Sequence, residues 1–167
     1  MKQAMMLLAF CLIIITLAAQ QSNDGKIDAS TGKKILDSLP ATMQNNNVNT
    51  KNDKVWDAAG FLGVVVHRDY GTTNKIMLDV INLSPSIGKV NAMIAKPSTN
   101  SNYKIIKING YKALVQTLTS EVNKTGYELL MPINETLVTF KAFDYTQDQF
   151  ITIANKIPVA MIARKVK

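Results

Sequence analysis

The stretch YKIIKINGYKALVQTL, residues 103–118, decides the fold of this chain. Two strand-like runs flank Asn109-Gly110, a pair that favours the two-residue type I′ turn of a β-hairpin because both residues tolerate positive φ. Once the turn is placed, the cross-strand register follows from it. The predicted pairs are Ile108 with Tyr111, Lys107 with Lys112, and Ile106 with Ala113.

This register places two lysines opposite one another on one side of the predicted ribbon. Like charges in directly opposed positions cost stability, on the order of a few tenths of a kcal/mol. A protein retains such a pair either by solvating both ammonium groups or by placing an anion between them. Lys107 and Lys112 are therefore the candidate ligand-binding residues, and a solvated surface is the alternative interpretation.

Runs of branched and aromatic residues predict further strands on both sides of the hairpin. Pro132 donates no ladder hydrogen bond, so its strand is expected to end at a sheet edge or margin. The first two runs are separated by a short turn and predict an antiparallel pair. The expected strands are residues 61–68, 75–81, 127–133 and 137–143.

Helical spacing of apolar residues predicts helices that begin at recognisable caps. Thr146 and Gln149 have the spacing of a capping box. Ser84-Pro85 reads as a serine N-cap followed by proline at the first helical position. Asp28 is the expected N-cap of the first helix, which Pro40 should end. The stretch after Pro158 is left open between a helical turn and a strand.

The order of these elements predicts an α+β fold, with a largely antiparallel sheet of about six strands and helices packed on one or both faces. The packed domain is expected to span residues 55–167. Residues 20–54 are expected to hold a short helix followed by an Asn-rich linker. Within them, QNNNVNTKNDK at 44–54 contains almost nothing to bury and predicts a flexible loop.

Residues 103–157 resemble the carboxy-terminal part of Mog1/PsbP-like domains. The resemblance rests on the I-N-G-Y-K-A hairpin, the Y-E-L-L and L-V-T-F strands, and the closing Q-F-I-T-I-A-N-K helix. It implies an antiparallel sheet between helices and a role as a binding or assembly module, since several such domains are exported modules of this kind. It assigns no site residue.

The amino terminus predicts export. Lys2 is followed by an apolar run over residues 4–17 and by Ala18-Ala19, which is the order of a cleavable signal peptide over residues 1–19. An uncleaved anchor is the less favoured alternative, because a membrane span needs about 20 apolar residues. The only cysteine, Cys11, lies in this run, so the mature chain is expected to form no disulfide. Periplasmic or secreted localisation follows.

The formal net charge of +7 favours anionic surroundings. Nucleic acid is not an expected partner of an exported protein, and no stable membrane span is expected after cleavage. The lysines are spread along the chain, which is typical of a solubilising surface, and the densest basic cluster is the tail at 164–167. Asn82, Asn123 and Asn134 begin N-glycosylation sequons, which matter only in a eukaryotic secretory pathway.

His67 is the only histidine, so no histidine-based metal cluster is expected, and no cofactor is predicted. The leading hypothesis is an exported, non-enzymatic binding or assembly module with a protein partner or a small ligand in the extracytoplasmic space. One alternative is a carrier of a small apolar or anionic molecule. Another is a cofactor-independent hydrolase that uses His67 with Asp69 or Asp79. A structural histidine at the sheet margin is the simpler interpretation of His67.

Overall fold

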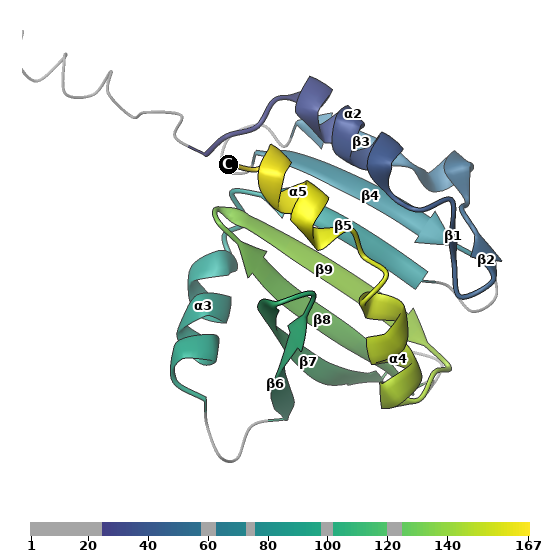
Figure 1. Cartoon of the computed structure of the whole chain (residues 1–167), viewed down its shortest axis with the longest axis vertical. Helices are drawn as coiled ribbons and strands as arrows, with labels where there is room; N and C mark the ends of the chain where they lie inside the picture. The colour runs from purple at the N-terminus through teal and green to yellow at the C-terminus, as the bar shows by residue number, and fades with distance from the viewer. Residues whose placement is uncertain (1–24, 58–62, 73–75, 98–101, 120–124) are drawn as a thin grey trace, which may run out of the picture.

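The computed structural model describes residues 25–57, 63–72, 76–97, 102–119 and 125–167 (Figure 1). Its centre is a seven-stranded antiparallel sheet in the order β3-β4-β5-β9-β8-β7-β6. The predicted, largely antiparallel sheet is therefore confirmed. The strands are β3 (Lys54–Asp57), β4 (Val64–Tyr70), β5 (Ile76–Asn82), β6 (Tyr103–Ile108), β7 (Tyr111–Thr119), β8 (Thr125–Ile133) and β9 (Thr136–Phe143).

The hairpin at residues 103–118 forms as predicted. Asn109 and Gly110 have φ values of 49° and 89°, as a type I′ turn requires. Ile108 pairs with Tyr111, and Lys107 lies directly opposite Lys112. Both lysines are exposed.

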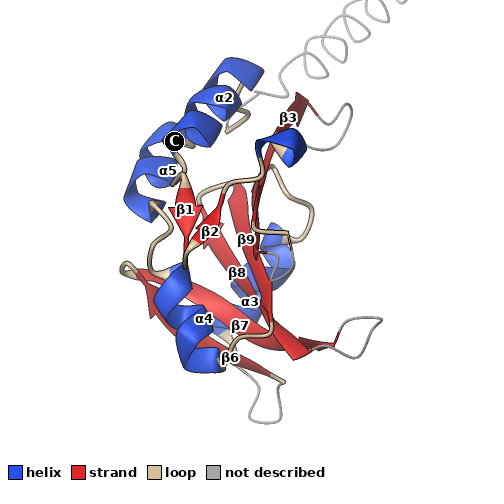
Figure 2. Ribbon diagram, turned by 90° about the vertical axis from the view of Figure 1, so that its right-hand side faces the viewer, coloured by secondary structure: helices blue, strands red, loops and turns tan. Residues whose placement is uncertain are grey.

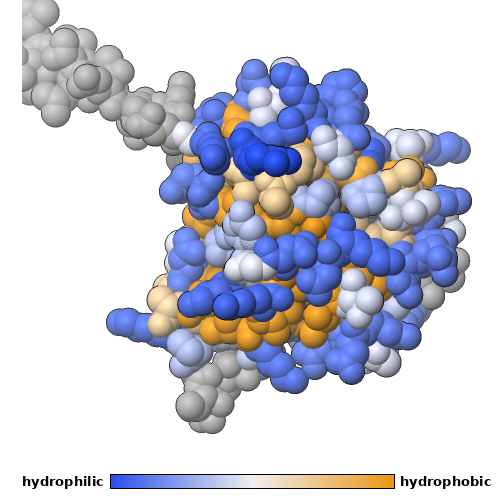
Figure 3. All heavy atoms as spheres, in the orientation of Figure 1, coloured by the Kyte–Doolittle hydropathy of each residue, from blue (hydrophilic) through white to orange (hydrophobic). Residues whose placement is uncertain are grey.

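The main core lies between one face of the sheet and helices α2 (Ala29–Ser38), α4 (Gln147–Ala154) and α5 (Val159–Lys165). Figure 2 shows these helices together on one side of the sheet. Phe150 of α4 is fully buried between the rings of Tyr127 and Phe140, with centroid distances of 5.5 and 5.2 Å. On the outside of this layer, hydrophilic side chains cover most of the visible surface, and apolar ones show between them (Figure 3).

Helix α3 (Ile87–Ala95) packs on the opposite face of the sheet. Val90 forms a second, smaller core with Leu114 of β7 and Leu137 of β9. Because side chains alternate along a strand, these two leucines point away from the main core. The closest contacts of α3 are with β7 and β8. On this face of the sheet, β4 and β5 lie beside the helix and not under it.

Two of the predicted helix caps are observed, and one differs. Asp28 accepts a hydrogen bond from the Thr31 backbone N–H at 2.6 Å, and this bond lowers the pKa of Asp28. Thr146 and Gln149 form the reciprocal capping box. The second helix begins at Ile87 instead of at Pro85, because residues 84–86 form a turn in which the Ser84 hydroxyl accepts from Ser86 N–H.

The segment 44–54, predicted as a flexible loop or linker, is a folded part of the structure. Gln44 and Asn45, with φ values of 49° and 63°, turn the chain between β1 (Thr42–Met43) and β2 (Asn46–Asn47). A short 3-10 helix, η1 (Thr50–Asn52), leads into β3. That strand pairs with β4 and brings the sheet to seven strands where about six were expected.

Two prolines, Pro132 and Pro158, lie where the chain changes its pairing or its type of element. Pairing of β8 with β7 stops at Leu130, while pairing with β9 continues through Pro132. Pro132, which has no N–H, therefore lies just beyond the end of the β7–β8 ladder. β8 itself is an inner strand of the sheet. After Pro158 the chain forms helix α5. Among the described residues no helix is long and apolar enough to span a membrane.

Candidate functional site

The only histidine lies in a polar cluster on the face of the sheet that carries α3. His67 of β4 is directly opposite Asp79 of β5, and Asp79 is directly opposite Thr139 of β9. The His67 Nδ1 and Asp79 Oδ1 atoms are 2.6 Å apart, and the Thr139 hydroxyl donates to Asp79 Oδ2 at 3.1 Å. Asp69, two residues along β4, places Oδ1 at 3.2 Å from His67 Nε2.

This geometry brings together the residues named in the hydrolase hypothesis, but in an arrangement that is closed on itself. In a hydrolytic triad one imidazole nitrogen faces a carboxylate and the other faces the nucleophile. Here both nitrogens of His67 face carboxylates, and the hydroxyl of Thr139 is engaged by Asp79. The His67 side chain is 21% exposed and Asp69 is 1% exposed. The cluster links three strands and orients His67 without presenting it to a nucleophile.

A second polar row crosses the same face, farther from the β6–β7 and β8–β9 turns. Glu128 of β8 accepts from Lys141 Nζ at 3.0 Å and from Gln116 Nε2 at 2.6 Å. Each contact joins directly opposed residues of neighbouring strands. Sequence reasoning did not find this row, because the residues are distant in the chain and only the register of β7, β8 and β9 brings them together. The charge of Glu128 is balanced by Lys141 within the row, so these residues act as a bridge between the strands.

Arg68 forms a largely buried ion pair with Asp53, on the opposite face of the sheet. Its guanidinium contacts Asp53 at 2.6 and 3.1 Å and donates to the Leu39 carbonyl at 3.1 Å. Burial acts to lower the pKa of Arg68, but the hydrogen bonds and charge of Asp53 outweigh it, and the pKa is raised. Arg68 thereby ties the segment after α2 and the start of β3 to strand β4. Burial also raises the pKa of the neighbouring Tyr70 to about 12.

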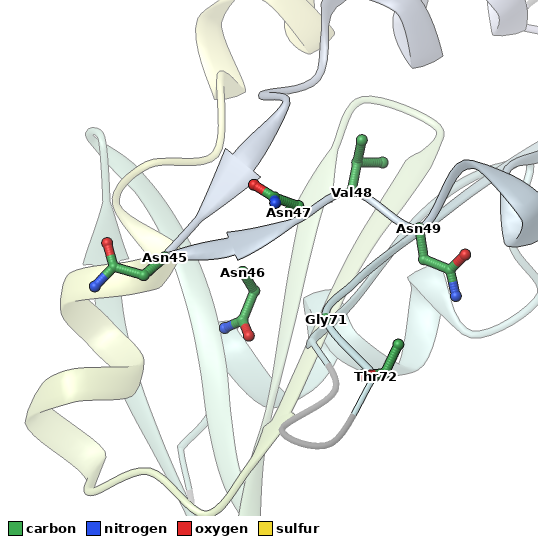
Figure 4. Close-up of a pocket in the computed structure, with 7 residues that line it drawn as sticks. All are labelled: Asn45, Asn46, Asn47, Val48, Asn49, Gly71 and Thr72. Atoms are coloured by element: carbon green, nitrogen blue, oxygen red, sulfur yellow. The ribbon is translucent and has the colours of Figure 1, made fainter.

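A polar depression of about 480 Å³ lies over the Asn-rich segment (Figure 4). The side chain of Asn46 donates to the Tyr145 hydroxyl at 3.0 Å, so it is partly committed to the protein. The other asparagine side chains point in different directions in Figure 4. The depression therefore offers scattered amides and no common binding point. It is lined by Asn45, Asn46, Asn47, Val48, Asn49, Gly71 and Thr72.

Trp56 is the one large apolar side chain that is strongly exposed among the described residues, at 43%. It belongs to β3, which pairs only with β4 and so forms an edge of the sheet. The neighbouring Asp57 is paired with Lys26 at 3.3 Å. The aromatic side chains differ in their surroundings. Tyr70 is fully buried and Tyr127 packs on Phe150, whereas Trp56 faces solvent.

The candidate ligand residues Lys107 and Lys112 stand apart from both polar rows. Next to them, the Asn109 side chain donates to the carbonyls of Asn155 and Ile157 at 3.1 and 3.0 Å. The hairpin turn is thereby fixed against the connection between α4 and α5. Within the described ranges, no group of three or more His, Cys, Asp or Glu residues could hold a metal ion.

Comparisons of the chain with protein-family models, with curated proteins and with solved structures found no match.

Proposed function

We propose that this protein is an exported, non-enzymatic binding or assembly module that takes a protein partner at the edge strand β3. The exposed Trp56 is the observation that carries the proposal. Tryptophan is enriched among the residues that dominate protein–protein binding energies, because it buries a large area at a small entropic cost. An indole left 43% exposed on a folded edge strand has this surface available for a partner.

The position of Trp56 suggests how the partner binds. An edge strand presents backbone N–H and C=O groups that can pair with an added strand, and side-chain contacts then select the partner. β3 is four residues long, and charged Lys54 and Asp57 stand at its ends. Short, charged edges resist indiscriminate pairing, so a specific contact at Trp56 would be needed. The antiparallel sheet with its closing helix also supports a distant relation to the Mog1/PsbP-like domains, with helices on both faces of the sheet.

Native mass spectrometry of the chain purified from its own host tests the proposal. We expect a bound protein with the wild type and with Trp56→Phe, and its loss with Trp56→Ala. Thermal melts of the variants serve as the folding control. A partner that stays bound to Trp56→Ala would contradict the role of β3, and turnover of a defined substrate would contradict a non-enzymatic function. A co-purified small molecule would favour the carrier.

The 2.6 Å contact between His67 and Asp79 favours the hydrolase as the second candidate. That hypothesis requires His67→Ala to abolish an activity while leaving the thermal melt unchanged. The closed polar cluster leads to the opposite expectation. Because His67 contacts two carboxylates from two strands, His67→Ala should lower the melting temperature by leaving Asp69 and Asp79 without this partner.

A further inference from the structure

The β6–β7 and β8–β9 turns lie at the same end of the sheet. Strand β7 begins where the antiparallel strand β8 ends, so Asn109-Gly110 and Asn134-Glu135 are neighbouring turns. Each turn carries an asparagine whose side chain reaches a more distant part of the chain. These two contacts determine which charged residues gather at this end.

The first contact joins the hairpin to the connection after α4. The Asn109 amide donates to the carbonyls of Asn155 and Ile157, which flank the exposed Lys156. Lys156 is therefore held beside the hairpin that carries the exposed pair Lys107 and Lys112. In the register of β6 and β7, Lys107 and Lys112 are opposite each other, so neither lysine has an acidic partner on the neighbouring strand of the hairpin.

The second contact brings the basic tail to the neighbouring turn. The Asn134 side chain donates to the Val166 carbonyl at 3.4 Å, so the last turn of α5 and the residues after it lie there. The nearby acidic side chains include Glu135, in the turn, Asp57, which is paired with Lys26, and Asp28, which caps α2. We call the basic residues around this end of the sheet the basic end. It consists of Lys107, Lys112, Lys156, Arg164, Lys165 and Lys167.

The described chain also begins at this end. The Gly25 carbonyl accepts from Asn82 at 2.7 Å, and Leu83 N–H donates to the Glu135 carbonyl. Figure 1 shows the start of the described chain beside the C-terminus. Residues 18–24, which separate the predicted apolar signal run from Gly25, can span at most about 25 Å when fully extended. This tether to the membrane rests on the proposed export: while that run lies in the membrane, the basic end is held close to the lipid headgroups.

We propose that the basic end docks on the anionic lipid headgroups of the membrane across which the chain is exported. The opposite end of the sheet carries Asp69, Asp144 and Asp148 together with Lys51, Lys54 and Lys104, so its positive charge is offset there, and the charge distribution favours one orientation toward a negative surface. Each lysine near an anionic membrane increases binding by about fivefold. Retention of the opposed pair Lys107 and Lys112 is then explained by the negative surface that both contact.

Vesicle co-sedimentation of the full chain tests this docking. We expect binding to phosphatidylcholine vesicles that contain phosphatidylglycerol, and much weaker binding to phosphatidylcholine alone. Lys107→Gln with Lys112→Gln should reduce binding to the anionic vesicles by about 25-fold. Replacing both lysines by arginine should preserve it. The matched control is Lys51→Gln with Lys96→Gln, which removes the same charge elsewhere on the surface.

The outcomes separate a located surface from net charge. A loss of vesicle binding that is confined to the Lys107/Lys112 double variant would support docking at the basic end. Wild-type binding that weakens as salt is added would support it as well. Equal losses in both double variants would overturn the proposal, because net charge alone would then govern binding. Equal binding of the wild type to neutral and anionic vesicles would overturn it as well. The vesicles contain no protein, so failure here leaves the partner proposed for Trp56 unaffected.

Discussion

Asn82 should be among the most costly polar residues to replace, because its buried amide fixes the start of the folded chain. The side chain is fully buried and accepts from Ile27 N–H at 2.9 Å. It donates to the Gly25 carbonyl at 2.7 Å and to the Thr136 hydroxyl at 3.1 Å. Each bond contributes about 1 kcal/mol net, and a buried group left unpaired costs about as much again.

Asn82→Ala should therefore lower the free energy of unfolding by about 3 kcal/mol. For a domain of this size that corresponds to a fall in melting temperature of roughly 6–12 °C. Asn102→Ala, at an exposed position, is the control and should change stability by less than about 0.5 kcal/mol. Urea unfolding gives the free energies. Trypsin should also cleave after Lys26 faster in Asn82→Ala, since the segment it releases contains that residue.

A melt of Asn82→Ala that matches Asn102→Ala would refute the anchoring role. Unchanged cleavage at Lys26 in a destabilised variant would also refute it, because the loss would then not lie at the start of the chain. The same burial bears on the sequon at Asn82. Both amide atoms are engaged inside the fold, so in a eukaryotic secretory pathway no glycosylation of the folded chain is expected at Asn82.

Three further perturbations have defined expected outcomes. Phe150→Ala should lower the unfolding free energy in urea by about 3–5 kcal/mol, because the ring is fully buried against two other rings; a loss below about 1 kcal/mol would contradict this packing. Burial raises the pKa of the Tyr70 hydroxyl to about 12. The neutral, buried hydroxyl therefore contributes fully to the stability of the fold below the ordinary tyrosine pKa, and this contribution is lost as the pH rises toward the raised pKa of the folded state. Tyr70→Phe should therefore reduce alkaline destabilisation in melts at increasing pH, and an unchanged pH dependence would argue against it. Lys107→Gln with Lys112→Gln should raise the unfolding free energy by about a few tenths of a kcal/mol, and a loss would show that the pair is not repulsive.

The hairpin at residues 103–118 could be predicted because its information is local. Asn109-Gly110 specifies the turn, the turn specifies the register, and the register places Lys107 opposite Lys112. The capping box at Thr146 is local in the same sense. These features need no knowledge of the rest of the fold.

The Asn-rich segment could not be predicted, because its order comes from contacts distant in sequence. Asn49 N–H donates to the Asp69 carbonyl, and Val48 bridges to Tyr70. Composition indicated only that the segment has little to bury. The His67 cluster is an intermediate case. Asp69 and Asp79 could be named as partners of His67, but Thr139 lies in a strand that only the sheet order brings alongside.

One chemical device organises the end of the sheet to which both the first described residues and the basic tail belong. Asn82, Asn109 and Asn134 each donate the side-chain amide to a carbonyl of a segment that no strand pairing would hold there. An amide suits this role, because it supplies two donors without introducing a charge that burial would penalise. The sheet and the segments attached to it are therefore held by different contacts. The sheet depends on its core, whereas the segments that carry Lys156 and the basic tail are held both by buried Ile157 and Val166 and by the amides of Asn109 and Asn134. Loss of the Asn109 or Asn134 contact should therefore loosen Lys156 or the basic tail, while the sheet keeps Lys107 and Lys112 in place.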